Sequence, residues 1–362
     1  MKRLGISVYP EHATLEENKA YIDKARDMGA KRIFSCLLSV EKDPEEIKKE
    51  FRELSDYAHA AGMEIIFDVA PYVFDRLGIS YDDLKFFHEI GADGIRLDEG
   101  FDGATEASMT RNPYGLKIEF NASIPTKYLD NIMSYLPDTD HMLACHNFYP
   151  QRYTGLGYDL FLKTSKSMKD KGLTLAAFVS SEQPGAFGPW PNKEGLCTLE
   201  MHRDLPIDVQ ARHLFATGLV DDVIIANCFP SDEEMASLKK INPAKLGLKL
   251  EPAYELSPEE ETIIYEYPDH VVRGDASEYL ARSTWPRVKY KDFDIPARNT
   301  RDIHRGDILV LNNEAGRYKG ELQIALQDMV NDGTKNVVGS IPENERILMD
   351  FIVPLRAFEF IR

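Results

Sequence analysis

The stretch Asp93-Gly94-Ile95-Arg96-Leu97-Asp98-Glu99-Gly100-Phe101 decides the fold. Ile95 and Leu97 alternate with polar neighbours, the pattern of a short β-strand whose successive side chains point to opposite faces. In a parallel β/α barrel, Arg96 and Asp98 would face the axis, and Asp98 would lie at the C-terminal mouth, where such enzymes carry their catalytic residues. A strand-end aspartate can also simply cap a helix or turn, so the rest of the chain must decide.

The first two-thirds of the chain alternates between strand and helix patterns. Strands are predicted at residues 4–9, 31–37, 63–69, 93–98, 116–121, 141–148, 173–179 and 222–228, and helices at 14–28, 44–61, 80–90, 126–136, 158–171, 206–217 and 231–241. Thr14 followed by Glu17 predicts a capping box for the first helix, and Gly29 predicts its end. Eight strands alternating with helices in about 240 residues predict a TIM (β/α)8 barrel over residues 1–242.

After residue 242 the pattern changes, because strand-like runs follow one another with few helices between them. The runs are residues 246–250, 262–267, 307–311, 322–326, 336–338 and 355–361, with one predicted helix near 344–351. Strands without intervening helices predict a β-rich second domain over residues 243–362, folded as a small closed barrel.

Composition limits the function classes. The 362 residues carry a net charge of −17 and a pI near 5.0, which argues against binding of nucleic acid and of anionic membrane surfaces. The N-terminus enters a strand without a signal-peptide h-region, and no 18-residue apolar run occurs, so we expect a cytoplasmic protein. The four cysteines stand singly and are expected to be free thiols.

The strand alternation predicts a polar ring at the barrel mouth. The strand-end members are Tyr9, Asp68, Asp98, Asn121, Asn147 and Asn227, and neighbouring loops add Glu11, Glu99, His146, Tyr149, Arg152, Glu200, His202 and Arg203. Arg96 and Glu119 fall one layer deeper, where a buried ion pair between them is expected. The connection 180–205 is unusually long for a compact domain and contains two aromatic turns flanked by proline, which predicts a packed lid over the mouth.

Paired carboxylates with amide, phenol and imidazole groups are typical of glycosidases, which need a general acid and a second carboxylate. Other chemistries have weaker support. His12, His146 and His202 lack metal-ligand spacing, and neither a nucleophile elbow nor a dinucleotide fingerprint is present, so no metal and no cofactor are expected. Lys117 faces the axis by phase, which leaves a Schiff-base or metal-assisted aldolase or isomerase as the alternative. A carbohydrate-binding protein without catalysis is the non-enzyme alternative.

The predicted second domain holds a local excess of positive charge. Residues 281–319 contain nine basic and five acidic side chains in a chain that is acidic overall. The pattern indicates a place for an anion, and the alternative is a set of solvated strand faces. Arg282, Arg298, Arg317 and Lys319 are the leading candidates to bind a phosphate, and the segment is predicted to fold over the barrel mouth.

Taken together, five segments resemble the bacterial 6-phospho-N-acetylmuramidase family: residues 5–11 (GISVYPE), 94–98 (GIRLD), 146–150 (HNFYP), 200–203 (EMHR) and 318–324 (YKGELQI). The resemblance covers nearly the whole chain. It implies a TIM barrel followed by a cyclophilin-like domain. It also implies cytoplasmic hydrolysis of the β-1,4 bond between 6-phospho-N-acetylmuramic acid and N-acetylglucosamine during peptidoglycan recycling, with this small phosphorylated amino-sugar disaccharide as the partner.

Strand phase and chemistry then suggest roles for three carboxylates. A 2-acetamido sugar can use its own carbonyl oxygen as the nucleophile, which requires one carboxylate to orient the amide and another to protonate the leaving oxygen. The sequence suggests Asp98 for orientation and Glu99 for protonation. Asp68, on the neighbouring strand, is the alternative acid, base or nucleophile.

Overall fold

The chain divides into two compact units, Met1–Lys239 and Lys240–Arg362. The computed structural model describes residues 2–38, 43–190 and 194–362. Each unit is described by itself below. In the described part of the chain, no helix is long and apolar enough to cross a bilayer.

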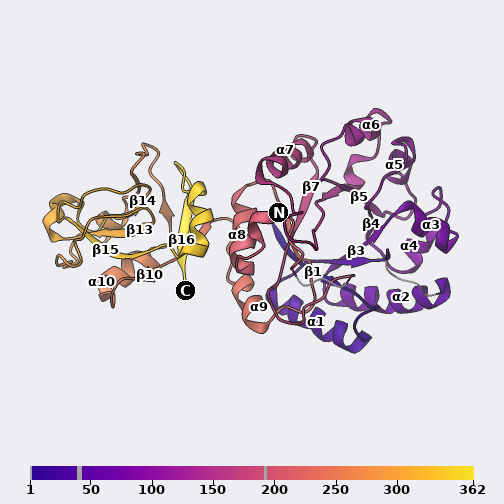
Figure 1. Cartoon of the computed structure of the whole chain (residues 1–362), viewed down its shortest axis with the longest axis horizontal. Helices are drawn as coiled ribbons and strands as arrows, with labels where there is room; N and C mark the ends of the chain where they lie inside the picture. The colour runs from indigo at the N-terminus through magenta and orange to yellow at the C-terminus, as the bar shows by residue number, and fades with distance from the viewer. Residues whose placement is uncertain (1, 39–42, 191–193) are drawn as a thin grey trace. The chain divides into compact units, whose positions relative to one another are not determined.

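The first unit is a closed barrel of eight parallel strands in sequential order (Figure 1). The strands are β1 (Arg3–Val8), β2 (Arg32–Cys36), β3 (Glu64–Val69), β4 (Gly94–Leu97), β5 (Lys117–Asn121), β6 (Met142–Cys145), β7 (Thr174–Val179) and β8 (Asp222–Ile225). The helices around them are α1 (Leu15–Met28), α2 (Pro44–Ala60), α3 (Pro71–Leu77), α4 (Lys85–Glu89), α5 (Ala104–Met109), α6 (Tyr128–Ser134), α7 (Tyr158–Lys169), α8 (Ile207–Ala216) and α9 (Asp232–Lys239). The predicted TIM barrel is confirmed.

Local chemistry explains where the helices begin. The capping box predicted for α1 is present, because Thr14 and Glu17 bond reciprocally, and Gly29 ends the helix with a φ of 98°. The predicted helix 80–90 is wrong in its first half. Side chains of Ser80 and Asp83 accept backbone N–H groups there and hold a turn, so α4 is only five residues long. The short helices α3 and α5 were not predicted.

A buried ion network fills the barrel interior below the mouth. Arg32 is fully buried and donates to both carboxylate oxygens of Glu119 (2.6 and 2.5 Å) and to Asp222 (3.1 Å). The predicted pair between Arg96 and Glu119 is therefore wrong. The two residues lie side by side in register on β4 and β5, but the guanidinium of Arg32 on β2 extends across the barrel to Glu119. The alternation of side chains along the strands predicted correctly that these residues point into the barrel. It did not predict which of them pair across the barrel axis.

Lys117 occupies the opposite end of the barrel from the mouth. It is the first residue of β5, and its Nζ lies 3.1 Å from a carboxylate oxygen of Glu64, the first residue of β3. Arg3 at the start of β1 joins the same group by bonding Glu64 and Asp222. This position removes the reason for a Schiff-base mechanism at Lys117, because reactions of such barrels take place at the other end.

The second unit contains two sheets, one of five strands in the order β10-β15-β13-β14-β12 and one of three in the order β11-β16-β9. The strands are β9 (Leu246–Lys249), β10 (Glu251–Pro252), β11 (His270–Val271), β12 (Leu280–Ser283), β13 (Asp307–Leu311), β14 (Leu322–Ala325), β15 (Lys335–Ser340) and β16 (Ala357–Ile361). Helical segments are α10 (Pro258–Glu261), η3 (Thr262–Glu266), α11 (Pro286–Lys289), η4 (Asn313–Tyr318) and η5 (Glu343–Phe351). The predicted cyclophilin-like closed barrel is not confirmed by this arrangement.

One predicted strand of the second unit is helical instead. Residues 262–267 were predicted as a strand-like run, but Thr262–Glu266 form a turn of π-helix. The cause lies just upstream, where Ser257 and Glu260 form a capping box and Pro258 occupies the first helical position. The helix started there continues through the β-branched residues, so local capping overrides β propensity.

Candidate active site

Arg96 lies at the centre of the polar groups at the barrel mouth. Its side chain is 3% exposed. Its Nη1 donates to Asp68 Oδ1 at 2.5 Å and to Asp98 Oδ1 at 3.0 Å, and its Nη2 donates to the Asn147 side chain. One guanidinium therefore joins the ends of β3, β4 and β6, and it fixes the orientation of two carboxylates.

The two carboxylates differ in environment. Asp68 is 3% exposed, whereas the side chain of Asp98 is 35% exposed. Burial raises the pKa of Asp68 to about 7; Arg96 opposes the shift, and the negative charge of Asp98 adds to it. The site therefore holds a carboxyl group that is partly protonated near neutral pH next to a more exposed one, an arrangement that is typical of acid–base sites.

A small cavity of about 110 Å³ opens above Arg96. Its polar wall consists of Asp68, Arg96, Asp98 and Asn147, and its apolar wall consists of Phe148, Phe178 and Trp190. Phe148 and Phe178 pack edge to face at 5.1 Å, and Trp190 lies 6.3 Å from Phe148. The volume suits a small substituent with one apolar and one polar side, and it is too small for a sugar ring.

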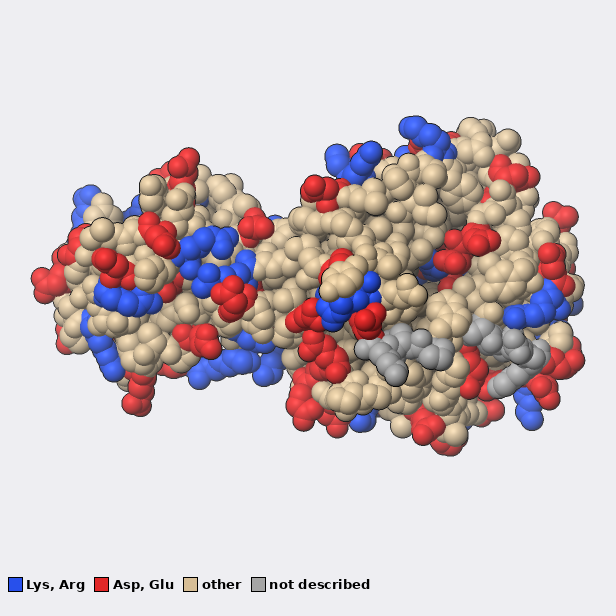
Figure 2. Space-filling model, in the orientation of Figure 1, with Lys and Arg blue, Asp and Glu red and all other residues tan. Residues whose placement is uncertain are grey.

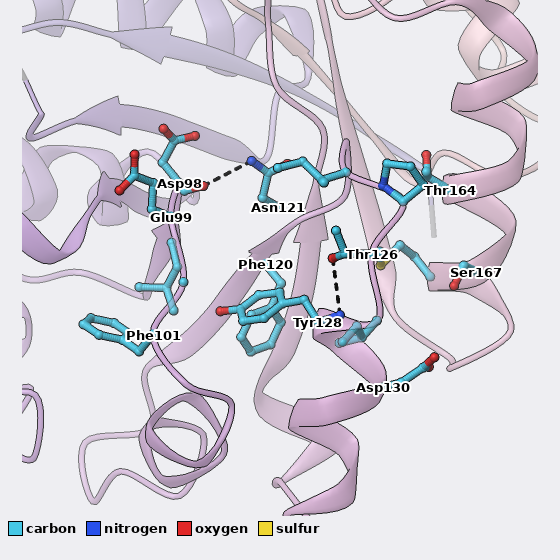
Figure 3. Close-up of a pocket in the computed structure, with 16 residues that line it drawn as sticks. Asp98, Glu99, Phe101, Phe120, Asn121, Thr126, Tyr128, Asp130, Thr164 and Ser167 are labelled. Carbon is cyan, nitrogen blue, oxygen red and sulfur yellow. Dashed lines mark hydrogen bonds between the residues drawn. The ribbon is translucent and has the colours of Figure 1, made fainter.

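A larger pocket of about 340 Å³ begins at the same residue, Asp98, and extends between α6 and α7 (Figure 3). In Figure 3 the carboxylates of Asp98 and Glu99 lie at the upper left of the pocket, and the aromatic rings of Phe101, Phe120 and Tyr128 lie below them in the view. Further lining residues are Leu97, Gly100, Asn121, Ile124, Pro125, Thr126, Leu129, Asp130, Thr164, Ser167 and Met168. Aromatic rings with scattered hydroxyl and carboxylate groups are suited to a sugar-sized ligand.

The walls of this larger pocket are held by specific bonds. Asn121 Nδ2 donates to the backbone oxygen of Asp98 at 3.2 Å, which ties the loop after β4 to the end of β5. The Tyr128 hydroxyl donates to Glu106, a fully buried carboxylate that also accepts the N–H of Gly103. Glu99 itself is exposed at the rim, so its carboxylate can reach a ligand.

A third pocket, of about 480 Å³, lies at the ends of β7 and β8 and is lined by Arg152, Arg203 and Asn227 among others. Its two cations are already paired. Arg152 makes two bonds of 2.7 Å to Asp204, and Arg203 bonds both oxygens of Glu200. Bonding to Arg203 lowers the pKa of Glu200 to about 2. These pairs leave little free positive charge for a phosphate.

Several predicted substrate-binding side chains are buried in structural roles. Tyr9 is fully buried and donates to the backbone oxygen of Ala226, and Asn227 bonds the backbone of Ser181. His146 lies between Ser123 and Ser165, and burial lowers its pKa to about 3. His202 is buried against His213, and burial lowers its pKa as well. These four side chains make structural bonds inside the barrel, although Asn227 also lines the third pocket, and their role in substrate binding stays a prediction.

The remaining predicted mouth residues stay near the surface. Glu11, in the turn after β1, and Tyr149, which follows β6, are both half-buried. Burial raises the pKa of Tyr149. Asn121 and Asn147 line the larger pocket and the small cavity respectively. Their roles in binding stay predictions.

The second half of the long connection that was predicted as a lid is tightly packed. Residues 196–199 are almost fully buried, and Glu200–His202 form a single 3-10 turn. Trp190, 41% exposed, contributes to the small cavity. Residues 191–193 lie outside the described part of the chain.

The sequence missed the residue on which the geometry depends most. Arg96 was assigned to a structural ion pair, although its same-face alternation with Asp98 already indicated a contact. The aromatic wall of the small cavity was also missed, because Phe148 and Trp190 come from a strand end and a loop whose proximity has no sequence signal. Within the described ranges, no cluster of three or more His, Cys, Asp or Glu residues could hold a metal ion.

The predicted phosphate-binding residues belong to the second unit. Arg282 pairs with the buried Glu321, and Arg317 donates to the Tyr318 hydroxyl. Lys319 follows in sequence. Arg298 has separate partners, since it stacks 4.0 Å over the Tyr254 ring and donates to the backbone oxygen of Glu255. The predicted set is therefore split between two places on that unit.

The closed barrel of eight parallel strands makes this a TIM-barrel protein. Charged side chains lie at the carboxyl ends of the strands, where enzymes of this fold carry their catalytic residues. Comparison with family models then identifies the family. Residues 4–240 match "6-phospho-N-acetylmuramidase, N-terminal", and residues 246–361 match "6-phospho-N-acetylmuramidase, C-terminal". The chain belongs to the 6-phospho-N-acetylmuramidase family, as the sequence motifs predicted.

Two solved structures are similar over essentially the full length. An uncharacterised protein of B. cereus shares 49% identity, with all of both chains covered and a TM-score of 0.91. A conserved Enterococcus faecalis protein of unknown function shares 26% identity, covering 99% of this chain and 96% of that one, with a TM-score of 0.75. No curated protein matches the chain.

Proposed function

We propose that the chain hydrolyses the β-1,4 bond between 6-phospho-N-acetylmuramic acid and N-acetylglucosamine, with the sugar's own acetamido group as the nucleophile. The observation that carries the proposal is the position of Asp98. It borders both the small aromatic cavity and the sugar-sized pocket, and Arg96 holds its carboxylate between them. The family membership supports the substrate class.

The small cavity is suited to the acetamido group. Phe148, Phe178 and Trp190 offer an apolar wall to the methyl group, and Asp98 on the polar side can accept the amide N–H. A hydrogen bond from that N–H to a carboxylate directs the carbonyl oxygen toward the anomeric carbon and stabilises the positive charge that develops on the amide. In this role a carboxylate oxygen of Asp98 accepts the amide N–H, and the bond from Arg96 orients that carboxylate.

The larger pocket is suited to the leaving sugar, and Glu99 at its rim is the proposed general acid. As the glycosidic C–O bond breaks, its oxygen takes the proton of Glu99, while the acetamido oxygen bonds to the anomeric carbon and forms a cyclic oxazolinium ion. Water then attacks that carbon and gives a proton to the Glu99 carboxylate, and the acetamido group is restored. Two displacements at one carbon leave its configuration unchanged.

Asp68 is the second candidate for the acid, because its pKa is raised to about 7. Arg96 Nη1 lies 2.5 Å from Asp68 Oδ1 and 3.0 Å from Asp98 Oδ1, so these oxygens are at most 5.5 Å apart. This upper bound is below the roughly 6.5–9.5 Å that separates the carboxyl groups of inverting pairs. Both assignments therefore predict retention. We favour Glu99, because Asp68 is 3% exposed and lies below Asp98.

The proposal is tested by offering the purified protein the phosphorylated disaccharide and following the two monosaccharide products by mass spectrometry. We expect cleavage of this substrate by the wild-type protein and a loss of roughly 10³-fold or more in Asp98→Asn. Wild-type turnover by a folded Asp98→Asn variant would remove Asp98 from the mechanism. No cleavage by the wild-type protein would refute the activity.

A further inference from the structure

A compact group of arginines lies on the second unit around one buried carboxylate. Glu321 is fully buried just before β14, and Arg282, on the neighbouring edge strand β12, bonds both of its oxygens at 2.6 and 3.1 Å. Thr284 and Gln323 each add one bond to the same carboxylate, at 3.2 and 2.8 Å. Each carboxylate oxygen thus accepts two hydrogen bonds, which is its ordinary capacity.

This arrangement leaves Arg287, on the short helix α11, without a free acceptor on Glu321. Its Nη1 lies 3.3 Å from a Glu321 oxygen, yet it is buried and makes no hydrogen bond to any described residue. The reason is that the oxygens of Glu321 are already occupied by Arg282, Thr284 and Gln323. A buried guanidinium N–H without an acceptor is unfavourable and is normally matched by an anion, a water or a ligand.

Tyr318 brings a third arginine into the group. The guanidinium groups of Arg287 and Arg317 lie 4.8 and 4.9 Å from the centre of its ring. Arg317 also donates to the Tyr318 hydroxyl at 2.7 Å, so the phenol proton stays available for another acceptor. That bond and the charges of Arg317, Arg287 and Arg282 lower the pKa of Tyr318.

Backbone geometry holds the two arginine-bearing segments together. Gly320 has a φ of 80°, and a Cβ placed on it would lie 3.4 Å from the Arg287 Cα. The turn that carries Arg317 and Tyr318 therefore lies directly against α11. This group holds Arg282, Arg287 and Arg317 with the single carboxylate of Glu321, an excess of two positive charges; the nearby Arg273 is paired with Asp275 and does not change this excess. On the face drawn in Figure 2, the Lys and Arg side chains of this unit lie among Asp and Glu side chains, in a chain whose net charge is −17.

We propose that Arg282, Arg287 and Arg317 form a binding site for a phosphate monoester. A dianionic phosphate matches the charge excess of two, and its oxygens can accept from Arg287, whose side chain is 21% exposed, from Arg317 and from the Tyr318 hydroxyl. The site deepens the prediction made from the basic segment by adding Arg287 and by leaving out Arg298 and Lys319. It does not depend on the proposed hydrolysis, because it is built within the second unit alone.

The test is calorimetric titration of the full chain with inorganic phosphate, with glucose 6-phosphate and with glucose at low ionic strength. We expect both phosphates to bind and glucose not to bind. Arg317→Gln and Arg287→Gln should each weaken phosphate binding about tenfold or more, a loss of about 1.4 kcal/mol. Arg298→Gln is the matched control, since Arg298 also stacks on a tyrosine of the same unit, and it should bind as the wild type does.

Two results would overturn the site: no phosphate binding by the wild-type protein, or equal weakening by Arg298→Gln. Arg317 is exposed, so its replacement is not expected to impair folding, and it remains informative if Arg287→Gln does not fold. A second arm asks which phosphate is bound in turnover. If the site holds the substrate's own phosphate, Arg317→Gln raises KM for the phosphorylated disaccharide about tenfold. If a separate metabolite is bound, KM is unchanged while glucose 6-phosphate binding is still weakened.

Discussion

Replacing Asp68 by asparagine should flatten the pH dependence of stability. Asp68 has an ordinary pKa of 3.8 in the unfolded chain and one of about 7 in the folded protein, because burial disfavours its charged form. Between these values the native state binds more protons than the unfolded state, so stability falls as pH rises from 4 to 7. About three pKa units correspond to at most about 4 kcal/mol, and Asp68→Asn removes this contribution.

Urea denaturation at pH 5, 6, 7 and 8 measures the effect. The wild-type free energy of unfolding should fall by up to about 1.4 kcal/mol per pH unit relative to Asp68→Asn, and the difference should level off above pH 7. Asp232→Asn, which removes an exposed carboxylate on α9, should keep the wild-type dependence. Parallel curves for Asp68→Asn and the wild type would refute the raised pKa.

Three further variants test other parts of the structure. Glu99→Gln should lower kcat on the disaccharide roughly 10²- to 10⁴-fold. A nitrophenyl glycoside, whose leaving group needs no proton, should restore most of the rate of this variant but not that of Asp98→Asn. Equal recovery of both variants would contradict the roles proposed for Glu99 and Asp98. Gly100→Ala would place a Cβ 2.1 Å from the Tyr128 hydroxyl, so it should distort the larger pocket and raise KM, and an unchanged KM would place the sugar elsewhere. Arg32→Met leaves the buried carboxylates of Glu119 and Asp222 without this partner, so it should lower the free energy of unfolding, measured with urea, by about 3–5 kcal/mol. A loss below about 1 kcal/mol would contradict the importance of the buried network.

Periodicity was enough to predict the barrel. The alternation of Ile95 and Leu97 with Arg96 and Asp98 set the inward face of β4, and the regular spacing of strand and helix patterns set the order of the sheet. The capping box at Thr14 fixed a helix start in the same way. These features depend on near neighbours in sequence, so a single sequence can predict them.

Pairing across the barrel could not be read from the sequence. Arg32 reaches Glu119 although 87 residues separate them, and Arg96 joins Asp68, Asp98 and Asn147. The pairing of inward-pointing side chains depends on the curvature of the closed sheet. The alternation of residues along a single strand carries no information about that curvature. The same limit applies to the second unit. Arg287 was not among the predicted phosphate-binding residues, because its unpaired N–H is a consequence of the hydrogen bonds that Glu321 accepts from other residues.

Proton NMR of the reaction mixture during the first turnovers tests the central claim most directly, because it reports both cleavage and configuration. The account predicts that the wild-type protein cleaves the phosphorylated disaccharide and that the 6-phospho-N-acetylmuramic acid released first is the β-anomer, which then equilibrates slowly with the α-form. Release of the α-anomer first would contradict the mechanism built on Asp98 and its neighbours, and an intact disaccharide would contradict the proposed activity itself.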